Sequence, residues 1–299
     1  MSTADLSPDT TAATDGHPGG RATGAAPAPA PAGTGHSTFG RLLISEWTKL
    51  RTVRSTVWSL VALVAVSVGF TVLILSVTAA TWASAQRKNS GAHAILLADP
   101  VPTLLGSGLI FGQLAICVLG VLAAANEYST GMIRSTLLAS PHRLRMLAAK
   151  CAAFAVLVFL VGEALSFCVF AIGGALLKSH VSVALTDRDV LRAVIGVGLY
   201  LAVLGLLSLA VGQIVRHTAG AITATVALII VVDPLAGLLP GSWGAHVSGY
   251  LPSSAGAQLL DPSPTAGQVL SAWEGFAVFG LWTALLLAVA GWLLVKRDA

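Results

Sequence analysis

The chain has 299 residues, of which 55% are hydrophobic and only 10% are charged, and its mean hydropathy is +0.83. Soluble domains usually carry about 25% charged residues, so this composition falls far outside the soluble range. The chain has 17 Lys and Arg against 13 Asp and Glu, and a net charge of +4 is too small to indicate a nucleic-acid partner. Because the apolar residues also form long blocks, we expect an integral, all-α membrane protein.

The first segment, residues 1–38, consists mostly of Ala, Pro, Thr, Gly and Ser. Such a composition buries too little apolar surface to offset the entropy of ordering, so we expect a disordered tail. The segment has no long apolar stretch, and we therefore expect no signal peptide there.

The next segment, residues 39–56, has apolar residues at helical spacing, interleaved with charged ones. This pattern predicts an amphipathic helix that lies along the membrane surface. A simple basic flank of the first membrane span is the alternative. The residues that define the expected interfacial helix are Glu46, Trp47, Lys49, Arg51 and Arg54.

The rest of the chain, residues 57–299, contains six apolar blocks long enough to cross a hydrocarbon core of about 30 Å. Asp233 and Pro234 interrupt the fifth block, so we expect that span to be short or to kink. The expected spans are residues 57–80, 103–125, 152–177, 190–215, 219–239 and 276–295.

The basic residues predict the orientation of these spans. With six spans both termini share one side, and 12 Lys and Arg residues fall on that side against five on the other. The positive-inside rule therefore predicts that both termini are cytoplasmic. The long segment 240–275 has no Lys or Arg, which fits an external location.

The connection between the second and third spans is about 25 residues long and dense in charge. Its leucines give it an apolar side, so part of it should be a short amphipathic helix on the membrane. Such a connection suits the docking of a cytoplasmic partner, although a plain positive-inside anchor would have the same charge. The candidate docking residues are Glu127, Gly131, Arg134, Pro141, Arg143 and Lys150.

These residues, together with Leu137, resemble the signature loop of type-2 ATP-binding-cassette permeases. The segment 45–56, SEWTKLRTVRST, resembles the start of many actinobacterial members of that family. The external Tyr250-Leu251-Pro252-Ser253 is similar to the family as well, and the resemblance covers residues 39–299.

The resemblance implies a permease subunit in a bacterial plasma membrane that pairs with a second copy or a homologue. Two separate cytoplasmic ATPase subunits, which hold ATP and magnesium, would drive alternating access, and the resemblance implies an exporter. The interfacial helix and the connection between the second and third spans would contact the ATPase. Short re-entrant helices would occupy the segment 240–275.

The residues themselves agree that this chain does not hydrolyse ATP. A phosphate-binding loop needs Gly before the Lys and Ser or Thr after it, and the only Lys-Ser pair, at Lys178, follows Leu177. We find no hydrolase motif and no metal-ligand spacing, and the three cysteines have no paired spacing. We therefore expect no catalytic residue and no metal or cofactor in this chain.

One acidic residue, Glu163, lies about 16 Å deep in the third span, at 1.5 Å per residue. A carboxyl group at that depth is costly, so it is a candidate for the translocation path or for proton binding. A packing role is the alternative. A gradient-driven transporter or channel that uses Glu163, and a membrane anchor that transports nothing, remain as alternative functions.

Overall fold

The computed structural model describes residues 39–87, 96–97, 99–131, 143–181, 183–240, 242–263 and 268–296. All of them belong to one compact unit, Ser37–Ala299. The tail expected to be disordered, residues 1–38, lies outside the described residues.

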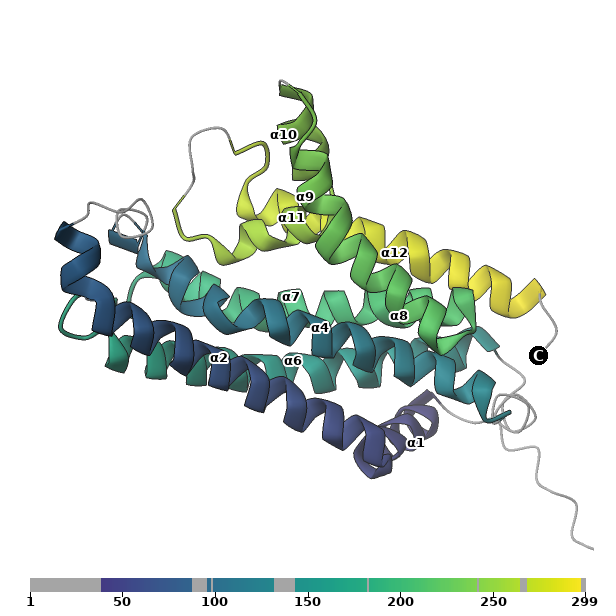
Figure 1. Ribbon diagram of the computed structural model, residues 1–299. Coiled ribbons are helices and arrows are strands. Elements are labelled where there is room, and N and C mark those ends of the chain that lie inside the picture. Colours follow the sequence, from purple (N-terminus) through teal and green to yellow (C-terminus); the bar gives the residue numbers. More distant parts are fainter. Residues whose placement is uncertain are drawn as a thin grey trace, which may run out of the picture. The chain divides into compact units, whose positions relative to one another are not determined.

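Every regular element in the described part of the chain is a helix (Figure 1). The elements in chain order are α1 (Phe39–Thr52), α2 (Arg54–Arg87), α4 (Pro100–Ser129), α6 (Arg143–Leu176), α7 (Arg188–Val215), α8 (Thr218–Val226), the π-helix η1 (Ala227–Val231), α9 (Val232–Gly237), α10 (Ser242–Gly249), α11 (Pro252–Ala257), the 3-10 helix η2 (Gln258–Leu260) and α12 (Ala272–Lys296).

Within the described residues six helices are long and apolar enough to cross a membrane, which agrees with the six predicted spans and indicates a multi-pass membrane protein. They are α2, α4, α6, α7, the run from α8 to α9, and α12. Most of these helices extend beyond the apolar blocks, because helical hydrogen bonding continues into the polar turns on either side. The largest difference is α6, which begins at Arg143 instead of residue 152.

Helix α7 forms the centre of the bundle and packs against α4, α6 and α12. Its side chains Tyr200, Leu201 and Leu204 are fully buried. The ring of Tyr200 lies 5.3 Å, between centroids, from the ring of Phe279 in α12. Aromatic and branched side chains of this size contribute most of the packing between the helices.

Glycines set how closely α4 approaches its neighbours. The Gly108–Gly112 pair, a small-xxx-small pattern, faces α2, where any Cβ would collide with Ser67. Gly120 faces α7, and a Cβ there would lie 2.5 Å from the carbonyl oxygen of Gly205. Small residues at such positions let membrane helices pack backbone against backbone.

The fifth span continues through Pro234 as a single helical run, with the π-helix η1 directly before α9. Proline has no N–H and its ring clashes with the carbonyl of the residue four positions earlier. The wider turn of the π-helix accommodates that clash, so the span keeps its length.

Short helices α10, α11 and η2 follow the fifth span. The carboxylate of Asp233 accepts hydrogen bonds from the hydroxyls of Ser253 (2.8 Å) and Ser254 (2.6 Å), which tie α9 to α11. Arg192 of α7 donates to the carbonyl oxygen of Asp261 at 3.0 Å. These contacts fix α11 and η2 against the central helices.

Candidate functional site

One end of the bundle brings together α1, the end of α4 and the start of α6 (Figure 1). Four charged side chains meet there, and we call them the charge cluster. They are Glu46, Lys49, Glu127 and Lys150. Glu46 and Lys49 were predicted for the interfacial helix. Glu127 and Lys150 were predicted for the connection between the second and third spans, which we call the partner-docking connection. The sequence did not predict that the two pairs would meet.

Opposite charges alternate along the cluster. The ammonium nitrogen of Lys49 lies 2.6 Å from a carboxylate oxygen of Glu46 and 3.6 Å from one of Glu127. The other oxygen of Glu127 pairs with Lys150. Lys150 also donates to the carbonyl oxygen of Ala123, at 3.4 Å. Glu127 is therefore the link between α1 and α6.

The cluster is largely removed from solvent. Glu46 and Glu127 are each 6% exposed and Lys150 is 2% exposed. Burial of a single charge costs several kcal/mol, so these groups are retained only because each has an opposite partner. Partial burial lowers the pKa of Lys49, but the hydrogen bond and charge of Glu46 and the charge of Glu127 outweigh it, and the net pKa is raised.

Helix α1 reaches the cluster because its apolar side packs on the bundle. Leu50 is buried, and Leu43 and Trp47 are partly buried against the core. The helix predicted over residues 39–56 is interrupted at Val53, because α1 ends at Thr52 and α2 begins at Arg54. Glu46 lies on the buried side, whereas Arg51 is exposed.

The end of α4 positions Glu127. Gly131 adopts a positive φ of 70°, which is the left-handed conformation that commonly ends helices. A Cβ at Gly131 would meet no atom within 4 Å, so the backbone conformation alone accounts for this glycine. Glu127 lies one turn earlier, inside the helix.

The partner-docking connection differs from our expectation in one respect. Residues 143–150, which we placed in the connection, form the first two turns of α6. A helix fits here because Leu144 and Leu147 continue the apolar spacing of the third span. The predicted docking residues Arg134 and Pro141 lie outside the described residues.

Further polar contacts hold the helices at this end. Arg143 donates to the carbonyl oxygen of Leu294, near the end of α12, at 2.8 Å. The hydroxyl of Tyr128 donates to Gln213 of α7 at 2.6 Å, and the guanidinium of Arg216 lies 4.8 Å from the centre of the Tyr128 ring. Sequence reasoning missed Tyr128 and Arg216, although both lie among the charged residues that bound the spans.

Glu163 is not part of the charge cluster. It follows Lys150 by 13 residues on α6, about 20 Å along the helix. Both carboxyl oxygens are buried and have no hydrogen-bond partner among the described residues. They pack against Gly198 of α7, where a side chain would collide with them.

Within the described residues no three His, Cys, Asp or Glu side chains lie close enough to hold a metal ion. No protein-family model, no curated protein and no solved structure matches the chain.

Proposed function

We propose that this chain is the permease subunit of an ATP-driven exporter of the type-2 ATP-binding-cassette kind. It works as a dimer with a second copy or a homologue, and a separate ATPase subunit supplies the energy. The observation that supports this proposal best is the charge cluster. It joins α1 to both helices that bound the partner-docking connection.

The cluster suits the transmission of a displacement. A push on the connection between α4 and α6 passes through Glu127 and Lys150 into the long membrane helix α6. The contact of Glu127 with Lys49 carries the same push to α1. Because Glu127 and Lys150 are buried and paired, separating them is costly, and the partly buried Lys49 ties α1 to this pair, so the three helices move together.

The same end of the bundle is the basic one, which supports a cytoplasmic location for it and for both termini. Exposed cations on α1, α2, the start of α6 and the end of α12 are Arg41, Arg51, Arg54, Arg145 and Lys296. With that orientation α1 lies at the inner surface of a bacterial plasma membrane, where exposed Arg51 and Arg54 face anionic head groups.

The energy source tests the proposal. Inverted membrane vesicles from the source organism, with and without this chain, are incubated with a panel of lipophilic fluorescent compounds added outside. We expect chain-dependent uptake of at least one compound with ATP, and none with an imposed proton gradient alone. Uptake that depends on the proton gradient and does not depend on ATP would contradict the proposal.

Glu163 favours one alternative, a gradient-driven transporter. A carboxyl group without a partner in a membrane span must be protonated, meet water or bind a cation. In the ATP-driven account, Glu163→Gln keeps the uptake within about twofold, because the amide replaces a neutral carboxyl of equal size. Loss of uptake in this variant, with Ala171→Ser on the same helix unchanged, would favour the alternative.

A further inference from the structure

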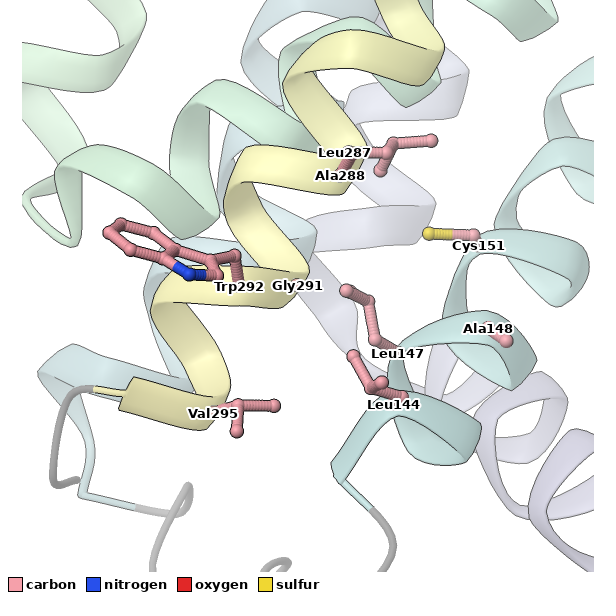
Figure 2. A pocket seen from close by; sticks show the side chains of 9 residues that line it. All are labelled: Leu144, Leu147, Ala148, Cys151, Leu287, Ala288, Gly291, Trp292 and Val295. Carbon is pink, nitrogen blue, oxygen red and sulfur yellow. The ribbon is translucent and has the colours of Figure 1, made fainter.

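A groove runs between the start of α6 and the end of α12 (Figure 2). Its volume of about 580 Å³ falls within the roughly 300–1,000 Å³ typical of ligand sites. Figure 2 shows Leu144, Leu147 and Cys151 of α6 and Leu287 and Val295 of α12 extending into the space between the helices, whereas the Trp292 ring points away from α6. The residues that matter for its chemistry are Leu144, Leu147, Cys151, Leu287, Trp292 and Val295.

The walls of the groove are almost entirely apolar, and no acidic side chain lines it. Leu144, Trp292 and Val295 are 57%, 56% and 54% exposed, although they lie on membrane-spanning helices. Gly291 allows α12 to face the leucines of α6 closely, since even a Cβ would come within 3.2 Å of Leu144. In a bilayer such a surface is covered by hydrocarbon.

The end of the groove carries positive charge. Arg143 crosses it from α6 to the carbonyl oxygen of Leu294. Arg145, two residues later, is exposed. The ammonium group of Lys296 lies 4.7 Å from the centre of the Trp292 ring. An amphipathic aromatic ring beside a cation at the end of a span is typical of the level of the lipid head groups.

We propose that this groove is a binding site for an anionic phospholipid. One acyl chain lies in the groove between α6 and α12, and the phosphate lies among Arg143, Arg145 and Lys296. Cations at a bilayer surface attract anionic lipid, and the apolar walls give the acyl chain a fixed place. A free phosphate would leave the walls uncovered. A second copy of the chain, docked on this groove with two-fold symmetry, would bring these same cations together, and their repulsion disfavours it.

Photolabelling tests the site directly. The full chain is placed in phosphatidylcholine vesicles that contain a small fraction of phosphatidylglycerol with a diazirine on one acyl chain. After illumination, we expect the label on residues 144–151 and 287–295. Unlabelled phosphatidylglycerol should compete with the probe, whereas added phosphatidylcholine should not.

Matched variants distinguish a specific lipid site from the annular lipid that surrounds any membrane protein. Ala148→Phe puts a ring into the groove and should remove most of the label, whereas Ala171→Phe, at an exposed position on the same helix, should not. Ala288→Phe fills the groove from α12 and replaces the first variant if that one does not fold. The double change Arg145→Gln with Lys296→Gln should lower the preference for phosphatidylglycerol by roughly tenfold.

Two results would overturn the proposal. One is label spread evenly over the exposed faces of α6, including the region of Ala171. The other is unchanged groove label in well-folded Ala148→Phe and Ala288→Phe. The test uses only the purified chain and lipid, so it stands whether or not the transporter proposal is correct.

Discussion

Among single residues, Glu127 has the most consequential position, because it pairs with a lysine on each of two other helices. Glu127→Gln leaves Lys150, only 2% exposed, without its opposite charge. Loss of one partner of a buried pair typically costs about 3–5 kcal/mol. We expect a loss of that order in the free energy of unfolding, measured by titration with a denaturing detergent.

A surface pair gives the matched control for this prediction. Asp189, whose side chain is 63% exposed, lies 3.3 Å from Arg192. Because solvent screens such pairs, Asp189→Asn should cost less than about 1 kcal/mol. Equal losses in the two variants would mean that the burial of the charge cluster has no energetic consequence.

Lys49 makes the stability of the cluster depend on pH at the alkaline end. Burial lowers the pKa of Lys49 in the folded protein, but the hydrogen bond and charge of Glu46 and the charge of Glu127 together outweigh it, so the pKa is raised above the usual 10.5. The stabilisation is therefore fully present below about pH 10.5 and is lost as the pH rises through the raised pKa.

Comparison with Lys49→Met isolates this contribution. We expect the wild type to have a higher midpoint of thermal unfolding than the variant at pH 8, and the difference to shrink at pH 11. A difference that grows with pH would show that Lys49 has the opposite effect on folding.

Among the helices, α4 and α7 approach so closely that a single methyl group has to move the backbone. Gly120→Ala places a Cβ 2.5 Å from a carbonyl oxygen of α7, and overpacking of this kind costs about 1–3 kcal/mol. Gly69→Ala, on α2, meets no atom within 4 Å and should be neutral or stabilising by up to about 1 kcal/mol. Denaturing-detergent titrations of both variants test this; destabilisation by Gly69→Ala alone would contradict the packing.

The spans could be predicted from the sequence because each carries about 20 apolar residues, a signal that depends on nothing else in the fold. The start of α6 could not, because Arg143 and Lys150 look like residues of a connection until Leu294 and Glu127 are seen to bind them. The π-helix before Pro234 also has no local signal beyond the proline itself.

The candidate site was predictable only as two separate groups. Glu46 and Lys49 belonged to a helix expected on the membrane surface, and Glu127 and Lys150 belonged to a connection far along the chain. Their meeting depends on the packing of α1 against α6, which charge patterns along one sequence do not encode. Glu46, named only as one of the charged residues of the interfacial helix, is buried.

At the scale of the whole molecule, the described residues form six candidate spans and a basic end that holds a buried charge cluster. The spans by themselves are compatible with a channel, a pump or an anchor. Our proposal of a transporter rests on the cluster, because an anchor has no need to connect α1 to the two helices that bound a charged connection.

The most direct test is co-purification of the ATPase. The tagged chain is extracted gently from membranes of its source organism, and the proteins bound to it are identified by mass spectrometry. Three forms are compared: the wild type, Arg134→Glu in the predicted docking connection, and Arg188→Glu, an exposed residue at the start of α7.

We predict that a stoichiometric subunit with a phosphate-binding loop accompanies the wild type and Arg188→Glu and is lost from Arg134→Glu. The absence of any such subunit from the wild type, under extraction that preserves other membrane complexes, would contradict the account.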